Sequence, residues 1–326
     1  MTRRAWTWLT VLAASAGLVA VPASAQPQTA PPTGPITLVV GYPAGGTADT
    51  GARILAEKLT LLLGQPVLVE NKPGAGGQLA ARQVKAARVD GSVLFFTNGH
   101  TVVTVPLTVK SPGFDTEVDF TPVAPVANFE LALVAHPSTM ATTLAELMAY
   151  YERMPDRRDI AVPAPASAPE FVVGRLAQLL KANVQAVPYR GALPAVQDVL
   201  GAQVPAAVVP VGDVLQHVRA GKLTALAVTH PSAQLPGVPG FAQLKLPELA
   251  VTDFLGVYGP PGLSATTVQR YNTAIRQVLA MPDVIAKLEG FSLQPDPGTP
   301  ARLAERFQQS RNQVRGLVKA VNFQPQ

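Results

Sequence analysis

The chain has 326 residues, a formal net charge of +5 and no cysteine. This length is sufficient for two domains of ordinary size, and without disulfides the hydrophobic core must hold the fold together. The balance of 26 basic against 21 acidic residues, with no basic run interleaved with aromatic residues, is not typical of a nucleic-acid-binding protein.

Residues 1–25 have the pattern of a secretory signal peptide. Arg3 and Arg4 form a positive segment, the stretch "AWTWLTVLAASAGLVAV" is apolar, and Ala23-Ser24-Ala25 is a small-residue cleavage site. The pattern predicts export to the periplasm with Gln26 as the new N-terminus, and an uncleaved membrane anchor is the alternative. Later apolar runs are too short to span a bilayer.

After a leader at residues 26–34, apolar runs alternate with helical periodicity. Strands are predicted at 36–40, 66–70 and 92–98. Helices are predicted from the end of the first glycine turn to Gly64 and from residue 78 to about Arg88. This β-α-β-α-β order predicts a parallel sheet with right-handed crossovers.

A second alternation of strands and helices follows a less regular stretch. Its predicted strands cover 129–136, 159–165, 184–190, 205–211 and 223–230. Its predicted helices cover 143–154, 170–182, 193–203 and 213–222. A stretch rich in proline and glycine at 231–244 interrupts the pattern, and a strand at 254–262 and helices at about 264–280, 282–289 and 299–320 complete it.

These elements predict an α/β protein with two lobes and a cleft between them. Because the chain returns to the first unit, we expect a discontinuous first domain of residues 26–130 and 251–326 and a second domain of residues 131–250. The carboxyl ends of parallel strands would then face the cleft, which is where ligands bind in open α/β sheets.

The stretch "GYPAGGTADTGARI" from Gly41 to Ile54 joins a strand to a helix. No Gly-Lys-Ser/Thr follows, as a Walker A loop requires, and the spacing is not the G-x-G-x-x-G of a dinucleotide site. Gly45 and Gly46 let the backbone approach a ligand, and the amides and dipole of the following helix favour an anion. A phosphate, a carboxylate and a turn without a ligand are all compatible with this loop. For the similar turn "ENKPGAGG" at 70–77, we favour a role in shaping the chain.

Groups with catalytic potential are few. The chain has no G-x-S-x-G elbow, and its four histidines are scattered without metal-ligand spacing. His100 follows the strand at 92–98, so we expect a cleft residue there rather than a catalytic base. Asp198 and Asp213 give no sign of pairing for acid–base work. The sequence thus predicts no catalysis, no metal and no cofactor.

Five motifs in a fixed order resemble one known family. They are "YPAGGTAD", "LLGQPVLVENKPGAGGQLAA", "DG…LFFTNG", "VPYRGALPAVQDVLGAQV" and "VRAGKLTALAVT". The chain resembles the Bug family, the periplasmic substrate-binding proteins of tripartite tricarboxylate transporters, over residues 35–320. The resemblance implies a type II periplasmic binding protein of two domains, each a parallel-rich sheet flanked by helices, that closes over a small carboxylate. It also implies membrane transporter subunits as partners, no nucleic acid, and a monomer.

The resemblance implies the ligand-binding residues as well. In the family, the loop after the first strand and the following helix hold a carboxylate, partly through ordered waters, and three further loops complete the site. The matching positions are Tyr42, Pro43, Ala44, Gly45, Gly46, Thr47 and Asp49, then Thr97, Asn98 and His100, then the 163–169 loop with Ala166 and Ser167, and the turn of Tyr189, Arg190 and Gly191.

Some positions depart from the family pattern. Ala48 replaces a hydroxyl residue, Ser167 is the only hydroxyl of its loop, and Pro205, Val209 and Pro210 stand where polar residues are frequent. We therefore expect a less polar ligand on the side of the second domain, such as an aromatic or branched acid, or altered binding.

The predicted function is carboxylate capture for transport. The alternatives are a sensory component that signals to a membrane receptor and, less favoured because nucleotide cofactors are scarce outside the cytoplasm, an exported enzyme that uses the glycine loop for a phosphate group.

Overall fold

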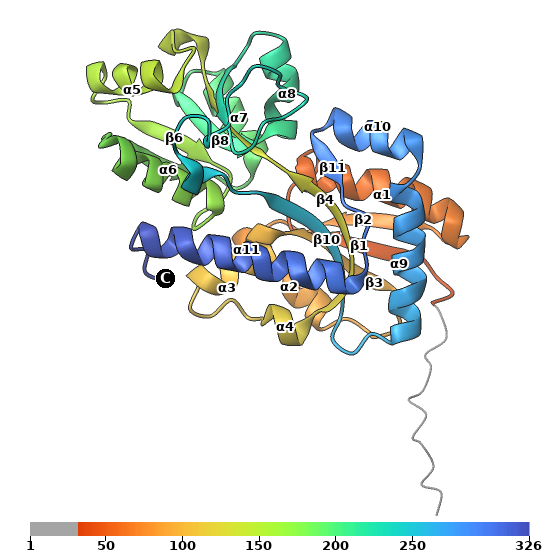
Figure 1. Ribbon diagram of the computed structural model, residues 1–326. Helices are drawn as coiled ribbons and strands as arrows, with labels where there is room; N and C mark the ends of the chain where they lie inside the picture. The colour runs from red at the N-terminus through yellow and green to blue at the C-terminus, as the bar shows by residue number, and fades with distance from the viewer. Residues whose placement is uncertain (1–31, 326) are drawn as a thin grey trace, which may run out of the picture.

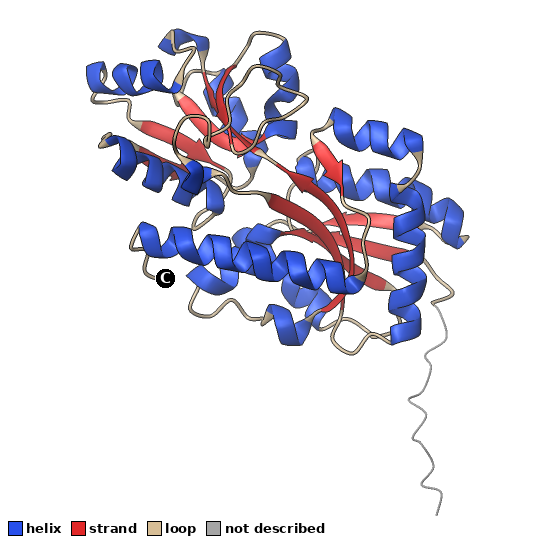
Figure 2. Cartoon of the chain, viewed as in Figure 1, coloured by secondary structure: helices blue, strands red, loops and turns tan. Residues whose placement is uncertain are grey.

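The computed structural model describes residues 32–325, and the predicted signal peptide lies outside this range. The described chain forms two lobes, each with one β-sheet and helices on its faces (Figure 1). Figure 2 shows the strands gathered into two separate groups with the helices outside them. No helix in residues 32–325 combines the length and the apolar composition needed to cross a bilayer.

The first lobe contains a six-stranded sheet in the order β11-β4-β10-β3-β1-β2. Its strands are β1 (Ile36–Val40), β2 (Val67–Asn71), β3 (Val93–Asn98), β4 (Thr121–Phe129), β10 (Asp253–Gly259) and β11 (Leu293–Pro295). Its helices are α1 (Thr47–Leu63), α2 (Gln78–Lys85), α3 (Val105–Thr108), α4 (Thr116–Asp119), α9 (Ala265–Leu279), α10 (Pro282–Gly290) and α11 (Pro300–Ala320).

The second lobe contains a five-stranded sheet in the order β7-β6-β8-β5-β9. Its strands are β5 (Leu131–Ala135), β6 (Asp159–Val162), β7 (Gln185–Pro188), β8 (Ala206–Pro210) and β9 (Thr224–Val228). Its helices are α5 (Leu144–Arg153), α6 (Ala168–Leu180), α7 (Ala192–Leu200) and α8 (Val211–Arg219). The chain passes from the first sheet to the second at Glu130, and α11 packs on both β4 and α6.

The predicted α/β fold class is confirmed, and both sheets are mixed. β1 pairs in parallel with β2 and β3, and β6 pairs in parallel with β7 and β8. Strand β10 runs antiparallel to β3 and β4 in the first sheet. Strand β5 runs antiparallel to β8 and β9 in the second sheet. The strands before residue 130 and after residue 252 lie in the first sheet. The predicted domain boundaries at residues 130 and 250 stay a prediction.

Strand β4 was not predicted, because Pro122 and Pro125 weaken the strand pattern at residues 121–129. A proline donates no hydrogen bond and is usually found at sheet edges or bulges. The pairing of β4 with β10 shifts by one residue on reaching each proline, so two bulges accommodate them inside the sheet. Tertiary packing thus overrides a local signal against a strand.

Candidate functional site

A cavity of about 70 Å³ lies between the two lobes. This volume is the space open to the centre of a water-sized sphere, and one ordered water needs about 10–15 Å³ of it. The cavity therefore has room for only a few water-sized groups, because the two lobes lie close together. Its walls come from the segments that follow β1 and β6 and from the ends of β3 and β8. These are carboxyl ends of strands, where the sequence predicted the cleft.

The structure brings many of the residues predicted for the site to this cavity. The predicted residues that line it are Tyr42, Pro43, Gly46, Thr47, Asn98, His100, Ser167 and Gly191, together with Pro163, Ala164 and Pro169 of the 163–169 loop. A neighbouring pocket of about 530 Å³ shares some of these loops and is lined by Tyr189 and Arg190. Ala44, Gly45, Asp49, Thr97 and Ala166 line neither of these two pockets, and their contact with a ligand stays a prediction.

Several lining residues were missed because most of them lie near the ends of elements that no spacing rule connects to the glycine loop. Phe129 and Leu131 flank the crossing point between the sheets, and Leu255 comes from β10. The other missed residues are Ala192 and Leu193, which directly follow the predicted turn, and Asp213 and Asp253. Of the departures from the family pattern, Ala48 and Pro210 do line the cavity, whereas Val209 is fully buried in the core of the second lobe.

Helix N-termini from both lobes meet at the cavity. Helices α1 and α7 begin after Gly46 and Gly191, and these glycines provide no side-chain cap. In contrast, α6 is capped by the Ser167 hydroxyl, which accepts a hydrogen bond from Glu170 N. An uncapped N-terminus offers free N–H groups and a partial positive charge, and both favour an anion.

The close approach of the lobes depends on Gly191. Its φ is +121°, a value that favours glycine, and an added Cβ would lie 3.2 Å from Pro43 Cγ of the opposite lobe. The start of α7 is thereby brought against the glycine loop that follows β1. Leu193 likewise lies near Gly45, at 3.4 Å from the position of an added Cβ.

Asp49 holds the glycine loop from behind the cavity. Its carboxylate accepts hydrogen bonds from Gly45 N at 2.8 Å, Arg53 Nε at 2.9 Å and Asn71 Nδ2 at 2.9 Å. Burial acts to raise the pKa of Asp49, but these donors outweigh it and hold the pKa below its usual value. The structure therefore gives Asp49 a positioning role in the loop.

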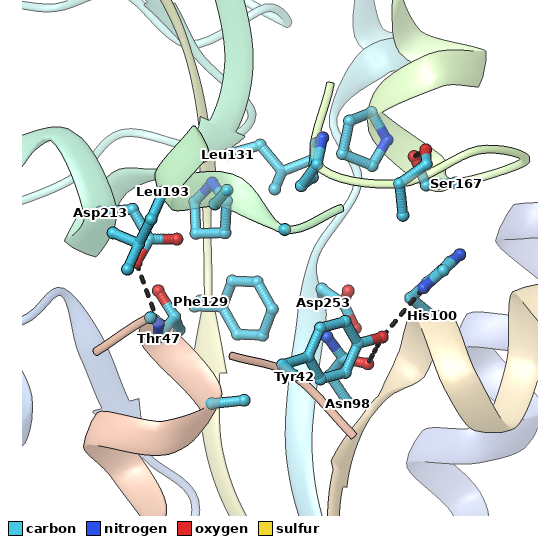
Figure 3. Close-up of a pocket in the computed structure, with 18 of the residues that line it drawn as sticks. Tyr42, Thr47, Asn98, His100, Phe129, Leu131, Ser167, Leu193, Asp213 and Asp253 are labelled. Carbon is cyan, nitrogen blue, oxygen red and sulfur yellow. Dashed lines mark hydrogen bonds between the residues drawn. The ribbon is translucent and has the colours of Figure 1, made fainter. Parts of the chain in front are cut away.

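The Tyr42 hydroxyl joins the polar residues on one wall of the cavity (Figure 3). It donates to Asn98 Oδ1 at 2.8 Å and lies 2.9 Å from His100 Nδ1. Because the phenol has one proton, which Asn98 accepts, His100 Nδ1 is placed to donate to the Tyr42 oxygen. His100 Nε2 is buried without a hydrogen bond among the described residues.

Burial lowers the pKa of His100 to about 4, although the nearby Pro165 carbonyl opposes this in part. The folded protein therefore favours neutral imidazole, and its stability falls as the pH drops from the unfolded-state value of about 6.5 towards 4. Relative to His100→Gln, the wild type should lose about 3 kcal/mol of unfolding free energy between pH 7 and pH 4.

Urea unfolding at a series of pH values measures this difference. The comparison with His100→Gln cancels the contributions of the other titrating groups that the two proteins share. A constant difference between wild type and variant across this pH range would show that His100 is not held neutral by burial.

Two aspartates complete the polar part of the cavity. Asp213 Oδ1 accepts a hydrogen bond of 2.9 Å from Thr47 N, which joins α8 of the second lobe to the start of α1 (Figure 3). Asp253 Oδ1 accepts hydrogen bonds from Gly99 N at 2.9 Å and Phe254 N at 2.7 Å. Burial raises the pKa of each carboxyl to about 6. No motif marked either residue, since each is a lone acidic residue at the start of an element.

The arrangement supports binding better than catalysis. Among the described residues no group of three or more His, Asp or Glu side chains could hold a metal ion. The hydroxyl of Ser167 donates to the Ala164 carbonyl at 2.6 Å, so it is directed to the backbone and not to a base. The cavity combines free backbone amides with an apolar wall.

Comparison with known proteins agrees with this geometry. Residues 51–323 match the family described as "Tripartite tricarboxylate transporter family receptor". The chain is 31% identical to protein BugT of Bordetella pertussis, with 89% of each chain covered.

Solved structures are similar over most of the chain. MatC from Rhodopseudomonas palustris with bound malate has a TM-score of 0.81 at 28% identity, covering 88% of this chain and 99% of that one. A protein of R. palustris solved with adipate has a TM-score of 0.86 at 26% identity, covering 90% and 99%. The periplasmic binding protein BugD has a TM-score of 0.85 at 27% identity, covering 90% and 100%. The chain therefore belongs to the tripartite tricarboxylate transporter family of receptors, in agreement with the resemblance to Bug proteins seen in its sequence.

Proposed function

We propose that this receptor captures a small organic carboxylate between its two lobes in the periplasm and delivers it to membrane subunits of a tripartite tricarboxylate-type transporter. The observation that carries the proposal is that α1 and α7, whose N-cap residues are glycines without a capping side chain, begin at one cavity from opposite lobes. In α1 the Thr47 amide is held by Asp213, and no such side-chain contact is found at the start of α7. We further propose that the protein acts as a monomer, because the cavity is formed within one chain.

Helix dipoles alone are too weak for tight binding. Each N-terminus contributes about 0.3–2 kcal/mol, whereas a micromolar ligand needs about 8 kcal/mol. Hydrogen bonds to the free amides and burial of an apolar body must supply the rest. The cavity wall suits such a body, because it includes Phe129, Leu131 and Leu255.

Two of the similar structures contain malate and adipate, which supports a carboxylate as the ligand class. The wall of the second lobe is less polar than the family pattern implied, with Pro163, Leu193 and Pro210 exposed to the cavity. An acid with an apolar or aromatic body fits this wall. No feature of the described residues favours the sensory or the enzymatic alternative.

The proposal is tested by thermal unfolding of the exported chain, which begins at the predicted new N-terminus Gln26, in the presence of a panel of ligands. The panel contains monocarboxylates, dicarboxylates, aromatic acids and nucleotides. A ligand present at about 100 times its Kd should stabilise the folded protein by about 2.7 kcal/mol, and the shift in Tm should grow with concentration. Stabilisation by a nucleotide and by no carboxylate would contradict the proposal.

A further inference from the structure

The charge of the cavity wall is unusual for a site that receives an anion. Asp213 and Asp253 line the cavity, and no lysine or arginine does so among the described residues. The arginines of the surrounding loops lie elsewhere, since Arg53 pairs with Asp49 and Arg190 lines the neighbouring pocket. Arg306 is near Asp253 but does not line the cavity. A ligand with two carboxylates would bring two negative charges to a lining that already has two carboxyl groups and no cation.

Asp213 also occupies one of the positions suited to a ligand carboxylate. Its Oδ1 accepts the hydrogen bond of Thr47 N, the first residue of α1. This is the geometry in which a helix N-terminus holds an anion. The N-terminus of α1 thus already binds a carboxylate of the protein, whereas the uncapped amides of α7 have no such side chain.

The remaining polar atoms of the wall need donors. The Oδ2 atoms of Asp213 and Asp253 make no hydrogen bond to any described residue. Both carboxyl groups belong to residues that line the cavity, so a ligand that supplies N–H or O–H groups would be favoured here. A second carboxylate could not satisfy these acceptors.

We propose that Asp213 and Asp253 make the cleft selective for a ligand with one carboxylate and one hydrogen-bond-donating group, such as an ammonium, amide or hydroxyl group, and that they exclude dicarboxylates. The ligand carboxylate binds the amides at the start of α7, and its donor group faces the two aspartates. This selectivity rests on the proposed function, because it concerns the second end of a carboxylate ligand.

Calorimetric titration of the exported chain with matched probes tests the selectivity. The pairs are succinate with succinamate, adipate with 6-aminohexanoate, and terephthalate with 4-carbamoylbenzoate. The three pairs differ in carbon skeleton, and binding will show which skeleton fits the cavity. In that pair, the wild type should bind the probe with the donor group at least about tenfold more tightly than the dicarboxylate. Asp213→Asn and Asp253→Asn should each reduce this ratio by about tenfold, since asparagine keeps the accepting oxygen and removes the charge.

Asp283→Asn is the matched control. Asp283 lies on α10, is paired with Lys58 at 2.7 Å and does not line the cavity, so its loss of charge should leave the ratio unchanged. Equal or tighter binding of the dicarboxylate by wild type would overturn the selectivity and leave the proposed function intact. An unchanged ratio in both cavity variants would overturn the role of the two aspartates. Absence of binding by every probe would count against the proposed function itself.

Discussion

Gly46→Val is expected to weaken carboxylate binding by at least about 100-fold, which corresponds to about 2.7 kcal/mol. Gly46 lines the cavity and precedes α1. A valine side chain there would fill part of a space of only about 70 Å³ and cover the first amides of the helix. The loss of affinity should therefore come from steric exclusion of the ligand.

The backbone at Gly46 can accept a side chain. Its φ of −82° and ψ of 174° are extended values open to any residue. An added Cβ would have Asp213 Oδ1 and Pro43 O as its nearest neighbours, both at 3.9 Å. We thus expect the free energy of unfolding to change by no more than about 1 kcal/mol, the usual cost of a poorer N-cap.

Gly290→Val serves as the control for Gly46→Val. Gly290 lies at the end of α10, with no atom within 4 Å of an added Cβ. Calorimetry should give wild-type affinity for this variant, and circular dichroism should show that both variants are folded. Wild-type affinity in Gly46→Val would mean that the ligand does not occupy the cavity beside Gly46.

Asp49→Asn is expected to lower the unfolding free energy by about 1–3 kcal/mol and to weaken ligand binding by about tenfold. The carboxylate of Asp49 is 2% exposed and accepts three hydrogen bonds, including one from the glycine loop at Gly45 N. In asparagine one oxygen becomes an NH₂ group that faces a donor. Either Gly45 N or Asn71 Nδ2 would then face an NH₂ group, and the loop before α1 would be held less firmly.

Urea unfolding and calorimetry together measure both effects of Asp49→Asn. Glu57→Gln is a suitable control because Glu57 forms an exposed ion pair with Lys287 at 3.0 Å. Such pairs contribute about 1 kcal/mol or less. If Asp49→Asn lost no more stability than this control, Asp49 would not be the residue that holds the loop.

The order of elements could be read from the sequence because local signals agree with the fold. Strand β1 is apolar except for Thr37, and it pairs on both sides with parallel strands inside the first sheet. Helix α1 ends at Gly64 with φ of 65°, as the glycine predicted. The glycine loop could likewise be placed at the cleft, since a strand followed by glycines and a helix brings backbone amides to the edge of a sheet.

The second wall of the site was beyond such local signals. Asp253 and Leu255 lie on β10, far along the chain from the glycine loop, and no spacing rule connects them to it. Asp213 was noted in the sequence as an acidic residue without a partner. Its partner is the backbone amide of Thr47. A backbone amide is common to almost every residue, so the sequence cannot show which one Asp213 binds.

The sequence by itself determined the α/β class, the order of most elements, the family and the loop at the start of α1, because these depend on short-range periodicity, on turn residues and on motifs. Only the tertiary structure decided which side chains meet between the lobes, how β4 accommodates its prolines, and that Asp49 holds the loop from outside the cavity. The physical reason is that the cavity is formed where segments distant in sequence converge. The charge and shape of the cavity depend on several segments at once, and no single segment determines them.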